Sequence, residues 1–236
     1  MKKALLVLSS YLLACTFSIQ AQDVSTLSWS QVCSGKMGTE WYGTDEAQRI
    51  ADDVLYVQKV NGGWMKNDEL HKLTAEQKQT LYDKRNEHSC LDNAATTQEM
   101  RFLAKVYKQT GIEKYKTAFM NGLSLILTAE KGCGGWSQYW PLSGNGSYQD
   151  YITFNDNLTT NVMKLLQEII GTLILIVPRL IRRRIDLVIF TISTIEKTNS
   201  RFESQSYPTI NHVLVSLRIG RTIRASEIQI LQHFAH

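Results

Sequence analysis

The amino-acid sequence predicts an all-α protein made of stacked helical hairpins, in which the loops between helices carry the functional side chains. Three observations indicate this fold class. Apolar residues recur at helical spacing in five successive windows, glycine ends several of these windows, and aromatic, glycine and acidic residues gather between them. Binding residues commonly lie in loops that a rigid helical scaffold positions.

Residues 44–60 form the first predicted helix. Thr44 or Asp45 can cap its N-terminus, and Gly62-Gly63 ends it because glycine adopts the positive φ values that a helix C-terminus needs. Its apolar positions at helical spacing are Ile50, Val54, Leu55 and Val57. A shorter helix is predicted over residues 74–85, with Glu76 and Gln77 as capping partners in its first turn.

Three further helices are predicted downstream. The first runs from Thr96 or Thr97 to Gln109, and the second covers residues 113–129. Their inward-facing residues are Met100, Leu103, Ala104 and Tyr107 in the first and Tyr115, Phe119, Leu123 and Ile126 in the second. A loop rich in Gly, Ser and Asn spans residues 131–149, and the last helix begins at Asp156 or Asn157 and runs to Ile170.

The first 21 residues have the pattern of a secretory signal peptide. Two lysines precede a short apolar run, and a small residue, Ala21, stands at the predicted cleavage site. The sequence before Cys15 also resembles a bacterial lipoprotein signal, in which Cys15 would be acylated. Both alternatives predict a secreted or periplasmic protein, and the apolar run is too short for a stable membrane span.

The charge of the chain is unevenly distributed. Residues 22–170 hold 15 Lys+Arg against 18 Asp+Glu, a net charge of −3, whereas residues 171–236 hold 9 against 4, a net charge of +5. The overall basic balance therefore comes from the two ends of the chain. It gives no support for nucleic-acid binding by the central part.

Three cysteines follow the predicted cleavage site, namely Cys33, Cys90 and Cys133. Their odd number and wide spacing do not form a disulfide framework, and the sequence contains no Cys-x-x-Cys or His-Glu-x-x-His metal motif. One disulfide in any of three pairings and buried free thiols are both compatible with the sequence.

Residues 171–236 differ in composition from the rest of the chain. The first 170 residues contain 14 Lys and 3 Arg, whereas this tail contains 1 Lys and 8 Arg. All five Trp and all four Cys precede the tail, and its apolar residues follow neither helical nor strand periodicity. We interpret the tail as an unrelated segment produced by a shift of reading frame; a genuine basic, membrane-associated segment is the alternative.

Several clusters between residues 41 and 156 occur in one order and together resemble a known family. They include the segments NGGWMKN at 61–67, LDNAATTQEMRFLA at 91–104, GGWSQYWPL at 134–142 and ITFND at 152–156, preceded by residues 41–43 and 47–55. These motifs resemble the family 10 polysaccharide lyases, which are secreted bacterial pectate lyases. The resemblance covers about residues 41–170, and Met65 and Ser137 stand where the family usually has proline.

The resemblance implies an (α/α) toroid of helical hairpins, incomplete in this chain, that cleaves α-1,4-linked polygalacturonate in pectin by calcium-assisted β-elimination. Asp92 and Asp156 match acidic motif positions, so the resemblance implies that they are the catalytic residues that organise Ca²⁺ and the substrate carboxylate. Each also has a simpler interpretation, because Asp92 can serve as a turn residue and Asp156 as a helix N-cap.

Six further residues are candidates for substrate binding. Cationic and amide donors suit carboxylate oxygens, and indole rings can stack on sugar faces. The candidates are Trp64, Lys66, Asn67, Asn93, Arg101 and Trp136. The alternative is structural: Lys66 and Arg101 can be solvated charges, and each Gly-Gly-Trp can end a helix and fill the core.

Proton abstraction in this family is credited to an arginine in the later half of the domain, and no matching motif is present here. The sequence therefore leaves open whether this copy is an active lyase or a truncated, inactive one. Two alternatives remain: a non-catalytic protein that binds pectin or oligogalacturonides, and an α/α-toroid hydrolase acting through paired carboxylates.

Overall fold

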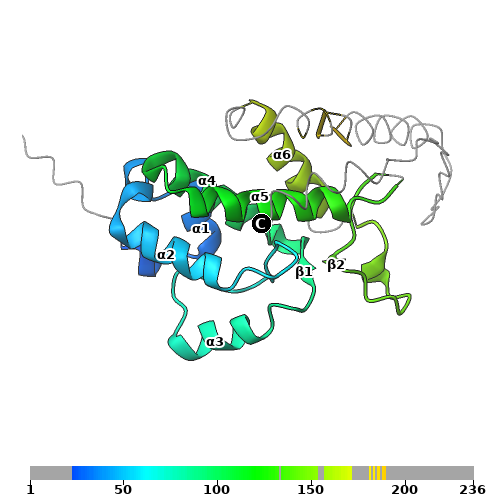
Figure 1. The fold of residues 1–236 in the computed structure, drawn as a ribbon, viewed down its shortest axis with the longest axis horizontal. Helices are drawn as coiled ribbons and strands as arrows, with labels where there is room; N and C mark the ends of the chain where they lie inside the picture. The colour runs from blue at the N-terminus through cyan, green and yellow to red at the C-terminus, as the bar shows by residue number, and fades with distance from the viewer. Residues whose placement is uncertain are drawn as a thin grey trace, which may run out of the picture.

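The computed structural model describes residues 23–132, 134–153 and 157–171, with six further residues between 181 and 189. Six α-helices dominate these residues (Figure 1), which confirms the all-α prediction. They are α1 (Trp29–Ser34), α2 (Asp45–Tyr56), α3 (Ala75–Asp83), α4 (Thr97–Thr110), α5 (Glu113–Ala129) and α6 (Leu158–Gly171). None of the helices in the described part is long and apolar enough to cross a membrane.

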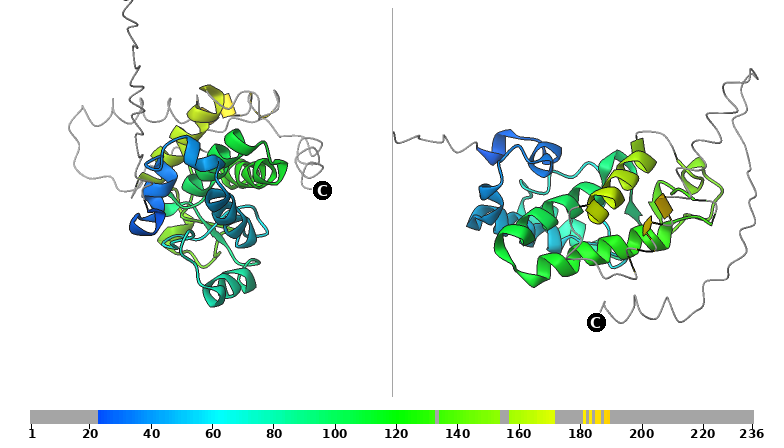
Figure 2. Two further views of the ribbon diagram at one scale, coloured as in Figure 1. Left: turned by 90° about the vertical axis from the view of Figure 1, so that its left-hand side faces the viewer. Right: turned by 90° about the horizontal axis from the view of Figure 1, so that it is seen from above.

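The α4–α5 hairpin is the centre of the fold, with α4 lying beside α5 (Figures 1 and 2). Gly111 makes the turn at φ 68°, a value that favours glycine, and its N–H donates to the carbonyl of Tyr107 at the end of α4. On the other sides of α4 lie α1, α2 and α6. The buried faces of these helices form one apolar core that includes Ile50, Phe102 and Leu166.

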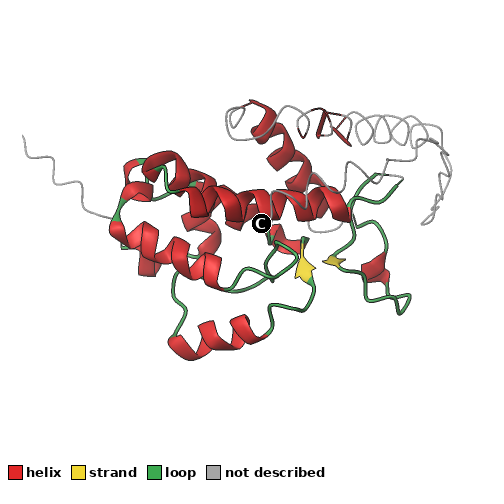
Figure 3. Ribbon diagram, in the orientation of Figure 1, coloured by secondary structure: helices red, strands yellow, loops and turns green. Residues whose placement is uncertain are grey.

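The loops contain two short strands that the sequence did not predict (Figure 3). Strand β1 (Ser89–Cys90) pairs antiparallel with β2 (Tyr139–Trp140), in the register Ser89 with Trp140 and Cys90 with Tyr139. Two-residue strands carry no recognisable alternation in sequence. The pairing joins the two long loops that hold the sequence motifs.

The predicted helix boundaries are close to the observed ones. Helix α3 has the expected capping box, in which the Thr74 and Gln77 side chains each accept from the other residue's backbone N–H. Helix α2 ends at Tyr56, four residues earlier than predicted. Helix α1 was not predicted, although Ser28 and Gln31 form a capping box at its start, a signal that the sequence already contained.

The described chain contains two copies of one structural unit. The first unit comprises α2 and α4, and the second comprises α5 and α6; the strands β1 and β2 lie at non-equivalent positions of the two units. In each unit the Trp of the Gly-Gly-Trp motif donates its indole N–H to a helix carbonyl ten residues earlier: Trp64 to Val54 and Trp136 to Ile126, both at 2.8 Å. The backbone N–H of Lys59 bonds to the carbonyl of Gly63 as that of Lys131 bonds to Gly135.

The correspondence continues to the start of the last helix of each unit. Thr96 Oγ1 donates to the carbonyl of Cys90 at 2.8 Å, and Thr159 Oγ1 donates to that of Thr153 at 2.9 Å, each six residues back. The interval from Trp to Thr is 96 − 64 = 32 residues in the first unit and 159 − 136 = 23 in the second. Helix α3 lies in the longer interval, so it belongs to the first unit alone.

The N-terminal segment buries a carboxylate at its contact with α4. Glu99 is 1% exposed, and its Oε1 accepts from the Trp29 indole at 2.7 Å and from the Gln98 amide at 3.0 Å. Its other oxygen is buried and has no hydrogen-bond partner within the described residues. Burial raises the pKa of Glu99 to about 7, and the hydrogen bond from Trp29 opposes this shift.

Both cysteines in the described part are free and buried: Cys33 and Cys90. Burial raises the pKa of each thiol, to about 11 for Cys90, so both stay protonated and unreactive at neutral pH. They therefore do not pair with each other. Cys133 lies outside the described residues, as does the predicted signal peptide.

Candidate active site at Asp92

Asp92 lies where three loops meet, directly after β1. It begins a short 3-10 turn, Asp92–Ala94, and its side chain is 2% exposed. Lys66 reaches it from the loop after Trp64, and Gln138 reaches it from the loop after Trp136. Because Lys66 and Gln138 each stand two residues after the Trp of their unit, the two copies of the Gly-Gly-Trp motif contribute equivalent positions to one carboxylate.

Both donors bind the same oxygen of Asp92. Lys66 Nζ lies 2.6 Å from Oδ2 of Asp92 and forms a salt bridge with it, and Gln138 Nε2 donates a short hydrogen bond to the same atom. The backbone holds Gln138 in place: its N–H donates to the Gln149 carbonyl at 3.1 Å, and its carbonyl accepts from Leu91 at 2.9 Å. Gln138 was not among the sequence candidates, although its position after Trp136 matches that of Lys66 after Trp64.

The charge of Asp92 is stabilised by these contacts. Burial alone would raise the pKa of Asp92, but the hydrogen bonds from Lys66 and Gln138 and the charge of Lys66 outweigh it, so the pKa is lowered. For Lys66, burial alone would lower the pKa, but the hydrogen bond and charge of Asp92 raise it overall. The two residues therefore form an ion pair at neutral pH.

Two buried oxygens at this site have no hydrogen-bond partner within the described residues. They are Oδ1 of Asp92 and Oε1 of Gln138. Buried polar atoms are nearly always hydrogen-bonded, so two orphaned acceptors on side chains that contact each other indicate a missing donor or cation. Carboxylate and amide oxygens are the ligand types that Ca²⁺ prefers.

The described residues do not by themselves make a complete cation site. No group of three or more His, Cys, Asp or Glu side chains with metal-binding proximity occurs within them. The Asp92 and Gln138 oxygens would supply part of a coordination shell. Water and a carboxylate of the substrate would have to supply the rest, which agrees with a cation shared between protein and an acidic ligand.

The backbone around Asp92 is unusually strained for non-glycine residues. Asn93, Ala94 and Thr96 have φ values of 51°, 62° and 64°, and Asn67 in the facing loop has 69°. Positive φ costs a non-glycine residue energy, and such residues cluster at functional sites. Asn67 and Asn93 are exposed and contact each other, with Asn93 Nδ2 donating to Asn67 Oδ1 at 3.4 Å. Both candidates thus lie at the edge of the Asp92 site.

An aromatic surface borders the same site. Lys66 Nζ lies 5.9 Å from the centroid of the Tyr139 ring, and the His88 ring packs against Tyr139 with centroids 4.7 Å apart. His88 is exposed, and Tyr139 is partly buried. Neither residue was a candidate from sequence, since their meeting depends on the β1–β2 pairing.

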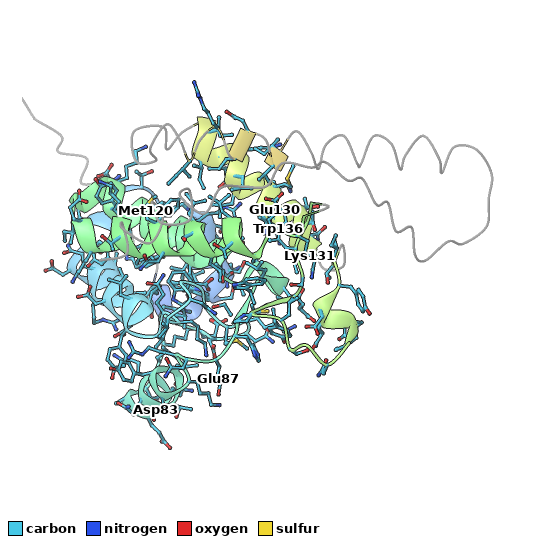
Figure 4. All side chains as sticks on the ribbon, turned by 45° about the vertical axis from the view of Figure 1, so that its right-hand side comes forward. Asp83, Glu87, Met120, Glu130, Lys131 and Trp136 are labelled. Carbon is cyan, nitrogen blue, oxygen red and sulfur yellow. The ribbon has the colours of Figure 1, made fainter. Side chains whose placement is uncertain are left out.

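The structure corrects the interpretation of the two tryptophans as sugar-stacking residues. Trp64 is 1% exposed and Trp136 is 0% exposed, so neither ring face is open to a ligand. Figure 4 shows Trp136 near Glu130 and Lys131 at the end of α5. Each indole fills the core beneath its loop, and its N–H donates to a helix carbonyl. This arrangement matches the alternative given from the sequence, in which each Gly-Gly-Trp ends a helix and fills the core.

Arg101 forms an ion pair with a residue of α6. Its Nε and Nη2 form a two-pronged salt bridge to Glu168, at 2.7 and 3.1 Å, and this pair ties α4 to α6. Within the described residues no hydrogen bond or salt bridge joins Arg101 to Asp92, so its contact with Glu168 favours the helix-packing interpretation, and a role in substrate binding stays a prediction. The second acidic candidate, Asp156, lies outside the described residues. In the register of the two units it corresponds to Asn93, since 156 − 93 = 63 and 159 − 96 = 63.

Comparison with known proteins finds similarity to one family. The family model for pectic acid lyase matches residues 58–173. A family 10 polysaccharide lyase from Cellvibrio cellulosa is 27% identical with a TM-score of 0.55, over 69% of this chain and 46% of that chain. An aspartate-to-alanine variant of a family 10 polysaccharide lyase from the same organism, in complex with trigalacturonic acid, is 26% identical with a TM-score of 0.54, over 70% and 50%.

The chain therefore spans about half the length of the solved structures that it matches. Among curated proteins no match is found. The structural similarity confirms the predicted α/α-toroid fold class.

Proposed function

We propose that this chain, whose residues 58–173 match the family model for pectic acid lyase, binds α-1,4-linked polygalacturonate at Asp92 and cleaves it by calcium-assisted β-elimination. The observation that carries this proposal is the buried Asp92, which has one oxygen held by Lys66 and Gln138 and the other without a partner among the described residues. A solved relative in complex with trigalacturonic acid supports the choice of substrate class.

The chemical difficulty of β-elimination is the weak acidity of the proton on C5 of a uronate. A bound Ca²⁺ withdraws charge from the substrate carboxylate and so stabilises the negative charge that develops as this proton leaves. In this chain Asp92 and Gln138 would hold the cation through their unpaired oxygens. Lys66 keeps Asp92 ionised, and the hydrogen bond from Gln138 fixes the orientation of its carboxylate.

The proton acceptor is not among the contacts of Asp92. The family resemblance credits this role to an arginine, and the Asp92 contacts in the described part include Lys66 and Gln138 but no arginine. Arg101 pairs with Glu168, and Arg85 stacks on the Tyr82 ring at 3.6 Å. This observation favours a second candidate function, in which the chain binds oligogalacturonides without cleaving them.

One experiment separates these functions. The purified chain is incubated with polygalacturonate and Ca²⁺, and the ultraviolet absorbance of the new C4–C5 double bond is followed. A lyase produces this absorbance, loses it when a chelator is added, and loses it in the Asp92→Asn variant. The Lys114→Met variant, altered at an exposed ion pair elsewhere on the fold, serves as the control and should behave as the parent.

The alternatives give different results in the same sample. Retention of the chain on immobilised polygalacturonate without any unsaturated product would establish a binding protein. New reducing ends without the double bond would establish a hydrolase. No binding and no product would exclude all three functions for this chain. Export by the segment 1–21 remains a proposal, which amino-terminal sequencing of the exported protein would test.

A further inference from the structure

The ammonium group of Lys66 binds one oxygen of the Asp92 carboxylate, and a divalent cation would approach the other oxygen of the same carboxylate. Lys66 Nζ lies 2.6 Å from Asp92 Oδ2, and Asp92 is almost fully buried while the Lys66 side chain is 21% exposed. A lysine has a long, flexible stem and a strongly hydrated head, so a partly exposed one can leave its partner. The buried aspartate cannot follow it.

Charge balance shows why this matters for a cation. Asp92 and Lys66 together are neutral, and the described residues provide no further acidic cluster at the site. A divalent ion that approaches Asp92 therefore meets a like charge at short range, and repulsion of this kind is strong where water is excluded. Removing Lys66 from Asp92 would relieve this repulsion and would leave a full negative charge for the ion.

The second unit shows how an uncharged side chain at the position of Lys66 contacts Asp92. Gln138 occupies the equivalent position in the second unit and donates to the same Asp92 oxygen as a neutral amide. Its other terminal atom, Oε1, accepts no hydrogen bond within the described residues and can act as a ligand, whereas an ammonium group has no acceptor atom. The first unit thus places an ammonium group at the site, which would repel a cation. The second unit places an amide there, whose oxygen would bind a cation.

We propose that Lys66 has two positions: in the free protein it is the counter-ion that keeps a divalent cation away from Asp92, and in the complex it pairs with a carboxylate of the polyuronate. The ring of Tyr139, 5.9 Å from Nζ, borders the path of the departing ammonium group. Binding of the cation and binding of the polyuronate are then coupled through one side chain. This inference rests on the proposed binding of polygalacturonate at Asp92.

Calorimetric titration of Ca²⁺ into the full chain, with and without trigalacturonate, tests the inference. The parent should bind Ca²⁺ weakly alone and more tightly when trigalacturonate is present. Lys66→Met should bind Ca²⁺ alone roughly tenfold more tightly than the parent, within the range of typical couplings between linked sites. In this variant trigalacturonate should no longer strengthen Ca²⁺ binding to the same extent.

Three variants keep the result interpretable. Lys66→Gln introduces the residue that the second unit uses, and it should share the gain if Lys66→Met proves too unstable to titrate. Lys66→Met combined with Asp92→Asn should lose the gain, because the cation then lacks its charged ligand. Lys114→Met removes the lysine of an exposed Lys–Asp ion pair, in which Nζ lies 2.6 Å from Asp52 Oδ1, and should leave Ca²⁺ binding unchanged.

The outcomes separate this inference from the function on which it rests. If Lys66→Met and Lys66→Gln, shown to be folded by circular dichroism, bind Ca²⁺ no more tightly than the parent, the counter-ion role is wrong, even where trigalacturonate still binds. If trigalacturonate binds neither the parent nor the variants at any Ca²⁺ concentration, the proposed function fails, and with it the second position of Lys66.

Discussion

The two units of this protein have matching backbone hydrogen bonds but carry different side chains at equivalent buried positions. In the first unit the last helix, α4, places Glu99 in the core; in the second, the equivalent position on α6 is Val162, since 162 − 99 = 63. Counted from the Trp of each unit, Lys66 corresponds to Gln138, since each stands two residues after that Trp. At these two positions the first unit therefore carries a charged side chain and the second a neutral one.

Within the first unit, two buried carboxylates seven residues apart differ in their partners. Asp92 has the ammonium group of Lys66, so its pKa is lowered. Burial raises the pKa of Glu99 to about 7, and the hydrogen bonds from the neutral Trp29 and Gln98 side chains oppose this rise only in part. No salt bridge among the described residues includes Glu99. The two carboxylates are both almost inaccessible to solvent but differ in charge behaviour, and the contact of Lys66 with Asp92 is one cause of this difference.

The largest effect is expected when Asp92 loses that cation. Lys66→Met should lower the free energy of unfolding by about 2–4 kcal/mol at pH 7, because a buried carboxylate is left without its counter-ion. Lys66→Gln should lower it less, since an amide still donates to Asp92. Urea denaturation measures both. Equal losses for the two variants would show that the charge of Lys66 contributes nothing to stability.

A smaller effect of opposite sign is expected at Glu99. Glu99→Gln keeps the acceptor for Trp29 but removes the charge, and it should raise the free energy of unfolding by about 1–3 kcal/mol at pH 8. Thermal unfolding would measure the gain. Glu40→Gln, at an exposed carboxylate that forms no salt bridge among the described residues, is the control and should change stability little.

The pH dependence of this gain follows from the sign of the shift. Because the pKa of Glu99 is raised from 4.5 to about 7 in the folded protein, its protonation stabilises the fold fully below pH 4.5. That stabilisation is lost as the pH rises to about 7. The difference in stability between Glu99→Gln and the parent should therefore appear above pH 4.5 and reach its full size near pH 7. A difference that does not vary with pH would mean that Glu99 has an ordinary pKa.

The next effect concerns the neutral donor to Glu99. Trp29→Phe removes the indole N–H that donates to Glu99 Oε1 at 2.7 Å, and it should lower the free energy of unfolding by about 1–3 kcal/mol at pH 8. A double-mutant cycle with Glu99→Val, the residue type of the second unit, isolates the hydrogen bond. The cost of Trp29→Phe should shrink in the valine background; an unchanged cost would assign it to lost ring packing.

The smallest effect is expected at an exposed ion pair. Lys114 Nζ lies 2.6 Å from Asp52 Oδ1, the same distance as in the Lys66–Asp92 pair, but both side chains are about half exposed. Solvent screens such a pair, so Lys114→Met should cost about 0–1 kcal/mol in the unfolding free energy. A loss as large as that of Lys66→Met would show that distance, and not burial, sets the strength of these pairs.

Much of the fold could be predicted from the sequence, because helices depend on local patterns. Caps at Thr44 and Thr74 and apolar residues at helical spacing identified α2, α3, α4 and α5 within a few residues. The ordered motifs also indicated the family and drew attention to Asp92 and Lys66, which the structure brings into contact. The predicted out-of-frame tail, residues 171–236, lies almost entirely outside the described residues and stays a prediction.

The partners of the site residues could not be predicted, because they depend on loops distant in sequence. Lys66 and Gln138 lie 26 and 46 residues from Asp92, and Glu168 lies 67 residues from Arg101. A motif shows that a Trp or an Arg is present but not whether its side chain points into the core, into a helix contact or into a site.

The sequence by itself determined where helices begin and end and which loops carry the acidic and amide groups, since capping and helical periodicity act over a few neighbouring residues. Only the tertiary structure decided that both Trp rings are core residues, that Arg101 ties two helices, and that Asp92 has a cationic partner whereas Glu99 has only neutral donors among the described residues. The physical reason is that burial and charge pairing are properties of the assembled loops and helices, where each group gains or loses water and partners at once.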